Sequence, residues 1–211
     1  MTLIIHTYIL GPLENNTYLL AEPESGQAVV IDPSFGIAEV AQTLRQNGWT
    51  LAGIWFTHAH YDHIAGTQEL VDTFGESLPM ALHPADLRLW QHHGGANMFG
   101  MRLDIKAQPN MELAHGQLLR LGGAEIQVRH TPGHTPGHVV FYAREINTVF
   151  CGDLIFQDGV GRTDLPGGSE LALVQSIREQ IFTLPDETQL LSGHGPETTV
   201  RDEKLNNPYI R

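Results

Sequence analysis

The chain of 211 residues contains one cysteine, Cys151, which excludes an intrachain disulfide framework and a cysteine-rich zinc cage. It also has no uncharged apolar run near the roughly 18 residues that a membrane-spanning helix needs. The N-terminal stretch has no basic region before its apolar residues and soon reaches Gly11-Pro12, which is not typical of a secretory signal. We therefore expect a cytoplasmic protein.

Positive charge is scarce, because 12 lysines and arginines stand against 24 aspartates and glutamates, giving a formal net charge of −12. Binding to nucleic acid needs clustered basic side chains that contact phosphates, and docking on anionic membranes needs the same charge. We expect neither partner, and predict a small-molecule substrate instead. Histidine is the residue type in excess, with 12 copies in the chain.

The length predicts one domain over residues 1–211, since a domain takes roughly 150 residues. Apolar runs at 3–10, 17–22 and 27–31 predict strands, and helical spacing of apolar residues predicts helices at 37–46, 64–74 and 170–182. Strands and helices alternate again in the second half, which favours two sheets with helices packed outside them.

Residues 92–110 show neither the alternation of a strand nor the spacing of a helix, because glycines and Pro109 interrupt both patterns. An irregular segment of this length in a compact domain is typically functional or mobile. Its apolar side chains, Met98, Phe99 and Met101, belong either to a lid over a site or to the core.

The run His58-x-His60-x-Asp62-His63 begins where a predicted buried strand ends. Residues two apart in extended chain point to the same side, so His58 and His60 can hold one ion. Asp62 and His63 lie where the chain turns into a helix and can face a neighbouring ion. Imidazole and carboxylate ligands suit zinc, and also iron or manganese.

Three further candidates lie at predicted strand-to-loop junctions. His134 stands between two Pro-Gly turns, Asp153 follows a buried strand, and His194 is flanked by glycines. Taken with the histidine run, they give a hypothesis of two metal sites. The first comprises His58, His60 and His134, and the second comprises Asp62, His63 and His194. Asp153 would bridge the two, since a carboxylate has two oxygens.

Four short motifs resemble those of the metallo-β-lactamase superfamily, both in their residues and in their order along the chain. They are Thr-His-Ala-His-Tyr-Asp-His, Thr-Pro-Gly-His-Thr-Pro-Gly-His, Gly-Asp and Gly-His-Gly. The resemblance covers nearly the whole chain and implies an α+β fold, the four-layer αβ/βα sandwich, with a dinuclear site at one edge. Within the superfamily the chain looks most like short, single-domain glyoxalase II-like proteins.

That resemblance implies a hydrolase with two Zn²⁺ ions per chain, with iron or manganese as alternatives. Hydroxide held between the metals would attack the carbonyl of an S-2-hydroxyacylglutathione thioester, and Asp62 would orient it as the catalytic carboxylate. Arg162 occupies the position of a lysine that binds glutathione carboxylates in glyoxalase II, although it could equally pair with Asp164. Two tyrosines of that family have no match, since Asp164 and Pro196 stand in their places.

Two other activities stay open. Subclass B3 β-lactamases share the six terminal ligands but lack the bridging aspartate, so hydrolysis of β-lactams or lactones is an alternative. Persulfide dioxygenases share the fold and hold one iron with two histidines and an aspartate, here His58, His134 and Asp153. The ending Gly193-His194-Gly195-Pro196 favours a hydrolase.

Overall fold

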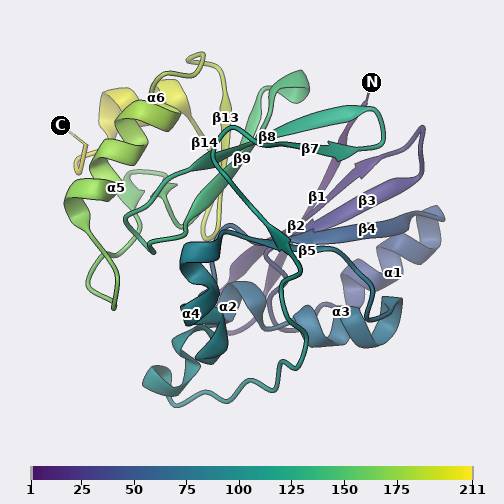
Figure 1. Ribbon diagram of the computed structural model, residues 1–211. Coiled ribbons are helices and arrows are strands. Elements are labelled where there is room, and N and C mark those ends of the chain that lie inside the picture. The colour runs from purple at the N-terminus through teal and green to yellow at the C-terminus, as the bar shows by residue number, and fades with distance from the viewer. Residues whose placement is uncertain (1, 211) are drawn as a thin grey trace.

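The computed structural model describes residues 2–210 and contains two mixed six-stranded sheets with a core between them (Figure 1). The first sheet has the order β1 (Ile4–Leu10), β2 (Asn15–Glu22), β3 (Gln27–Ile31), β4 (Thr50–Trp55), β5 (Met80–Leu82), β6 (Met111–Glu112). The second has the order β14 (Thr198–Thr199), β13 (Gln189–Ser192), β10 (Thr148–Gly152), β9 (Val139–Ala143), β8 (Ala124–His130), β7 (Leu118–Leu121). A separate hairpin joins β11 (Ile155–Phe156) to β12 (Gly159–Val160).

Helices cover the outer face of each sheet. On the first sheet these are α1 (Ala38–Asn47), α2 (Tyr61–Ile64), α3 (Thr67–Phe74) and α4 (Leu87–Gln91), with η1 (Pro84–Asp86) and η2 (His93–Phe99) flanking α4. On the second sheet they are α5 (Glu170–Ser176), the π-helix η4 (Ile177–Ile181) and α6 (Val200–Asn206), while the short η3 (Arg144–Ile146) connects β9 to β10. In Figure 1, α1–α4 lie on one side of the molecule and α5 and α6 on the other.

Three apolar cores separate the resulting layers. In β2, for example, Leu19 packs under the helices while its neighbour Leu20 points to the core between the sheets. This alternation is the period of two that a strand with both faces covered requires. A third core joins the second sheet to α5, η4 and α6. The structure therefore confirms the predicted α+β four-layer sandwich. Among the described helices, none is long and apolar enough to cross a membrane.

The helix predicted at 64–74 is divided and begins earlier. α2 starts at Tyr61, and α3 starts at Thr67 after a break at Gly66. A Cβ at Gly66 would lie 2.4 Å from the Ser34 carbonyl oxygen, so the loop after β3 packs directly on this backbone. The early start places Asp62 and His63 on the first turn of a helix.

Loops that follow several strands converge at one edge of the sandwich. They come after β3, β4, β10 and β13, and between β8 and β9. β3 and β4 run parallel in the first sheet, as do β10 and β13 in the second, so the carboxyl ends within each pair point the same way. The candidate site is built from these loops.

Candidate metal centre

The structure brings all seven predicted metal ligands together at this edge. Six are buried, and His194 is half-buried. The first half of the chain supplies four of them, from the loop after β4 and from α2, and the second half supplies the other three. They are His58, His60, Asp62 and His63, and then His134, Asp153 and His194.

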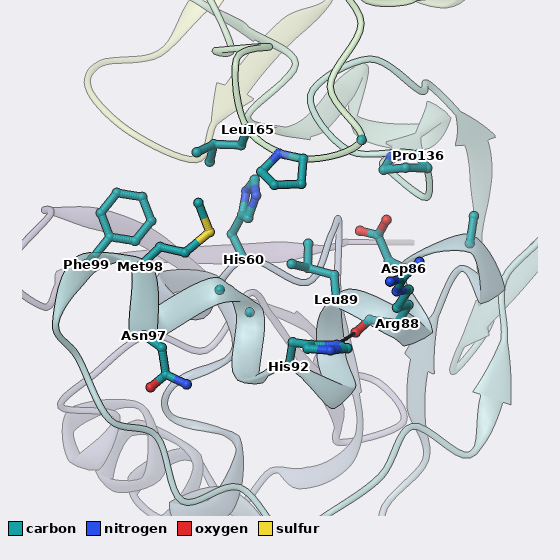
Figure 2. Close-up of a pocket in the computed structure, with 15 residues that line it drawn as sticks. His60, Asp86, Arg88, Leu89, His92, Asn97, Met98, Phe99, Pro136 and Leu165 are labelled. Carbon is teal, nitrogen blue, oxygen red and sulfur yellow. Dashed lines mark hydrogen bonds between the residues drawn. The ribbon is translucent and has the colours of Figure 1, made fainter.

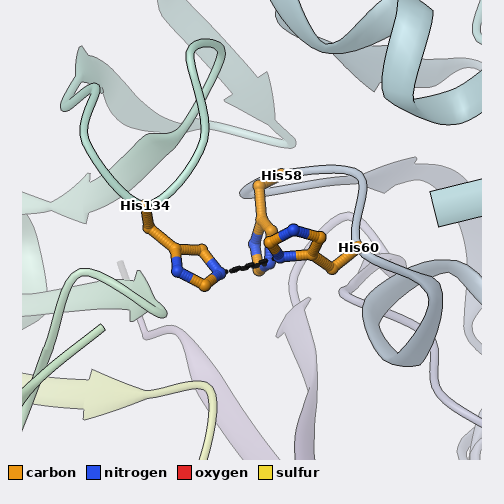
Figure 3. A group of neighbouring side chains, drawn as sticks. All are labelled: His58, His60 and His134. Atoms are coloured by element: carbon orange, nitrogen blue, oxygen red, sulfur yellow. Dashed lines mark hydrogen bonds between the residues drawn. The ribbon is translucent and has the colours of Figure 1, made fainter. Parts of the chain in front are cut away.

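The first triad comprises His58, His60 and His134, whose rings point toward one another (Figure 3). His60 Nδ1 lies 2.8 Å from His134 Nε2, which lies 3.2 Å from His58 Nε2. Burial lowers the pKa of His58 well below its ordinary value and that of His60 to about 3, and neighbouring histidines add to both effects. Burial also lowers the pKa of His134. Three neutral rings therefore converge with lone pairs available to a cation.

The second triad comprises Asp62, His63 and His194. Asp62 Oδ2 lies 3.4 Å from His63 Nε2 and 3.2 Å from His194 Nε2. Burial opposes charge on His63, but the carboxylates of Asp153, Asp62 and Asp32 together raise its pKa well above the ordinary value. The pKa of His194 is also raised, because Asp62 and Asp153 outweigh burial. In the protein without metal, protons therefore bind more tightly to this triad than to the first.

Asp153 lies between the triads, and its two oxygens together contact histidines of both. Its Oδ1 is 3.3 Å from His63 Nε2, while Oδ2 is 3.5 Å from His134 Nε2 and 3.7 Å from His194 Nε2. Although burial opposes its charge, the three histidines hold the pKa of Asp153 below its usual range. The carboxylate is thus ionised and placed to contact ions held by both triads.

Four of the five histidines predicted as ligands also have their second ring nitrogen bound, which fixes the ring orientation. The partners are Thr57 Oγ1 for His58 (3.0 Å), Asp32 Oδ2 for His63 (2.9 Å), the Arg162 carbonyl for His134 (2.8 Å) and the Leu13 carbonyl for His194 (2.9 Å). His138, four residues after His134, does not supply such support. It bonds Thr131 Oγ1 at 2.9 Å, and its ring lies 6.0 Å from that of His134.

Asp32 is a site residue that sequence reasoning missed. Besides holding His63, its carboxylate accepts hydrogen bonds from the Thr57 amide (2.7 Å) and hydroxyl (2.6 Å). Its place directly after β3, which pairs in parallel with β4, was the available signal. Parallel neighbours end at the same edge, so an aspartate there faces the histidine run.

Asp86, at the end of η1, was also missed. It is buried, and its Oδ2 accepts from the Ala59 amide (3.1 Å) and the Thr135 hydroxyl (2.8 Å), while Oδ1 accepts from the Gly137 amide (2.7 Å). Ala59 stands between His58 and His60, and Thr135 follows His134. One carboxylate therefore ties together the two loops that carry the first triad.

The buried polar atoms fit a pair of cations. Within the described part of the chain, His63 Nε2 and Asp153 Oδ1 are buried without a hydrogen-bond partner, although they lie only 3.3 Å apart. Buried polar atoms are nearly always satisfied, so such a pair needs an explanation. A cation between them would provide it, and nitrogen with carboxylate oxygen is a donor set that suits zinc, iron or manganese.

Arg162, the predicted substrate-binding residue, forms a two-pronged ion pair with Asp164. Its Nε and Nη2 each lie 2.7 Å from a carboxylate oxygen, and both side chains are exposed. It lines a cavity of about 280 Å³ together with Glu170 and Tyr209. The pairing with Asp164, the alternative given by the sequence, is therefore present, and contact with substrate stays a prediction.

With the geometry established, comparisons with known proteins identify the family. The profile described as "Metallo-beta-lactamase superfamily" matches residues 10–194. The chain belongs to this superfamily. Members similar to it include the probable metallo-hydrolase YqgX of Bacillus subtilis, which is 36% identical over 95% of this chain and 94% of its own length. Hydroxyacylglutathione hydrolase GloC of Haemophilus influenzae is 32% identical over 93% of each chain.

Solved structures of the superfamily agree with the fold. The B3 metallo-β-lactamase BLEG-1 matches with a TM-score of 0.90 and 34% identity, over 98% of this chain and 99% of its own. TTHA1623, solved in a di-iron-bound form, matches with a TM-score of 0.86 and 39% identity, over 97% and 99% of the two chains. The fold is thus shared by a protein described as a B3 metallo-β-lactamase and by one that holds two iron ions.

Proposed function

We propose that this protein is a dinuclear zinc hydrolase of S-2-hydroxyacylglutathione thioesters, as in glyoxalase II. The observation that carries the dinuclear part is the position of Asp153, whose two oxygens face the two triads. The thioester part is supported by the similarity to GloC, a hydroxyacylglutathione hydrolase. A mononuclear iron site would need only His58, His134 and Asp153, and would leave the second triad without a role.

The proposed chemistry assigns each carboxylate a task. When bound, two cations would lower the pKa of a water molecule and polarise the thioester carbonyl. His63 and His194 lower the pKa of Asp62 against the opposing effect of burial, so its ionised carboxylate can accept a hydrogen bond and orient the attacking water. Asp153 offsets the positive charge of both cations. The departing thiolate is a stable anion, so a thioester needs little help from a general acid.

Zinc is the proposed metal, with iron and manganese as alternatives. The first triad has three imidazoles beside Asp153, and the second has two imidazoles and the Asp62 carboxylate, and all three metals accept such sets. TTHA1623 in its di-iron form is a reason to include iron in any test of loading. The donor atoms themselves favour none of the three.

Hydrolysis of β-lactams is a second candidate. The similarity to BLEG-1, a B3 metallo-β-lactamase, over nearly the full length of both chains supports it. An amide leaving group needs a proton where a thiolate does not, so the same site would cleave a lactam less readily than a thioester. Lactones, which carry an oxygen leaving group, are a third substrate class for the same test.

The deciding experiment is steady-state hydrolysis of S-lactoylglutathione by zinc-loaded and iron-loaded protein, with Asp62→Ala as the control. We expect kcat/KM above about 10⁴ M⁻¹s⁻¹ for the wild type, a rate typical of enzymes on their own substrates, and near-complete loss in the variant. Turnover of a β-lactam with none of the thioester would favour the second candidate. Oxygen uptake with glutathione persulfide by protein holding one iron would contradict the hydrolase proposal.

A further inference from the structure

A cavity of about 520 Å³ opens directly beside His60, at the edge of the first triad (Figure 2). We call it the apolar cavity. Its walls come from three segments of the chain, namely η1 with α4, η2, and the loop at 165–167, and Pro136 completes it. Because His60 is a wall residue, a molecule that fills this cavity contacts the first triad.

The side chains that point into this space are mainly apolar. Figure 2 shows Met98 and Phe99 on one side, Leu165 on another and Leu89 beneath His60. Asp86 also borders the cavity, but both of its oxygens already accept hydrogen bonds. The guanidinium-bearing Arg88 is exposed and lies on the far side of Leu89 from Met98 and Phe99.

The wall formed by η2 is fixed to the segment after β4 that carries His58 and His60, which we call the metal loop. Gly94 packs so closely that a Cβ there would lie 2.3 Å from the Tyr61 amide nitrogen and 2.7 Å from the Ala59 carbonyl oxygen. The Phe99 ring also contacts Tyr61, at 5.3 Å between centroids. Yet Met98 is 62% and Phe99 44% exposed. Burying these two exposed side chains against the apolar atoms of a ligand would therefore favour binding.

The charged side of the site lies elsewhere. Arg162 holds the outward nitrogen of His134 through its carbonyl, and its side chain lines the smaller cavity instead of the apolar one. Glutathione carries charged groups that need such polar surroundings. On the other side of the carbonyl under attack lies the 2-hydroxyacyl portion. Its side group adjoins that carbonyl and can be apolar.

We propose that the apolar cavity receives the acyl side group, so that this enzyme prefers 2-hydroxyacyl thioesters with a bulky hydrocarbon or aryl group over the lactoyl thioester. This inference rests on the proposed thioesterase function and specifies its substrate class. The cavity is large enough for a phenyl or hexyl group, whereas the methyl group of a lactoyl thioester leaves most of it without contacts.

The test compares S-acylglutathiones whose 2-hydroxyacyl group carries methyl, n-hexyl or phenyl. We expect kcat/KM for the phenyl and hexyl substrates to exceed that for methyl by at least about 10-fold, the range for added hydrocarbon in an apolar pocket. Phe99→Ser should reduce this ratio at least about threefold, and Leu165→Trp, which fills the cavity, should reduce it about 10-fold. The matched control is Leu171→Ser on α5, at a position 81% exposed and outside the lining of the cavity, which should keep the wild-type ratio.

A binding measurement gives a second readout. In calorimetric titrations of metal-loaded protein, 2-hydroxy-2-phenylacetate should bind at least about 10-fold more tightly than 2-hydroxypropanoate. Equal kcat/KM for the three substrates, or equal affinity for the two acids, would overturn the inference while leaving the thioesterase function in place. If none of the thioesters is hydrolysed, the proposed function fails, and the inference fails with it.

Discussion

The two triads of the metal centre differ in chemistry and in surroundings. The first contains only imidazole, is buried throughout and has lowered histidine pKa values. The second includes the Asp62 carboxylate, has raised histidine pKa values and contains His194, whose side chain is 25% exposed. Protons therefore compete with a cation more strongly at the second triad than at the first.

Different carboxylates also support the two triads. Asp86 ties the loops of the first triad together, and Asp32 holds the outward nitrogen of His63 in the second. Asp153 alone faces both. We therefore expect two metal sites of unequal affinity at one edge of the sandwich, with Asp153 between them. Each substitution below tests one part of that arrangement.

Replacing the shared carboxylate should have the largest effect. Asp153→Asn keeps the shape but loses the negative charge, so both sites lose a ligand that offsets the cation charge. We expect kcat/KM to fall by more than about 100-fold, beyond the range for residues that only support a ligand. Zinc content should fall from two equivalents to one or none. Asp158→Asn, an exposed carboxylate in the next turn, is the control, and an Asp153→Asn enzyme that keeps two zincs would contradict a bridging role.

Loss of Asp86 should weaken the first triad selectively. Asp86→Ala removes the acceptor for two amides and a hydroxyl, so the loops carrying His58, His60 and His134 lose their common anchor. We expect zinc affinity at one site to fall about 10- to 100-fold, as for other supporting partners of metal ligands. Chelator competition should show the second site changing less. Asp72→Ala on α3, an exposed charge, should leave both affinities unchanged.

The convergence of the candidate ligands was predictable from the sequence because they lie in short motifs at the ends of strands. His58, His60, Asp62 and His63 come from one run of six residues, and the others are marked by Gly or Pro neighbours. Asp32 and Asp86 were missed because their importance arises from contacts with loops about 25 to 51 residues away. Local spacing carries no information on such contacts, since they depend on how strands pair and layers pack.

For the irregular segment at 92–110, too, the local sequence pattern did not predict the packing. Its composition indicated a break in periodicity, and two interpretations of its apolar residues were open. The structure shows a short helical segment, η2, attached to the metal loop with Met98 and Phe99 exposed. Neither side chain belongs to the core, because Gly94 allows the backbone to approach α2 while the following residues turn outward.

A drop in pH should empty the second triad before the first. Raised pKa values mean that His63 and His194 take up protons on acidification while His58 and His60, with lowered values, stay neutral. Since metal competes with protons, apparent affinity at the second site should fall about 10-fold per pH unit for each proton bound. Metal analysis after dialysis from about pH 7 to about pH 5 should pass through a one-zinc form. Loss of both zincs in one step would show that the triads do not differ.

The smallest expected effect concerns the attachment of η2 to the first triad's loop, and two adjacent glycines provide a matched test. Gly94 and Gly95 both have positive φ (63° and 75°), so alanine is strained at either. Only at Gly94 would the added Cβ meet backbone of Tyr61 and Ala59, since the nearest atom to Gly95 is Met98 Sδ at 3.8 Å. In urea unfolding at fixed zinc, Gly94→Ala should therefore lower the free energy of unfolding by about 1–3 kcal/mol more than Gly95→Ala. If the two variants cost the same, η2 is free to move away from the metal loop, and the apolar cavity would then be bordered by a mobile segment instead of a fixed wall.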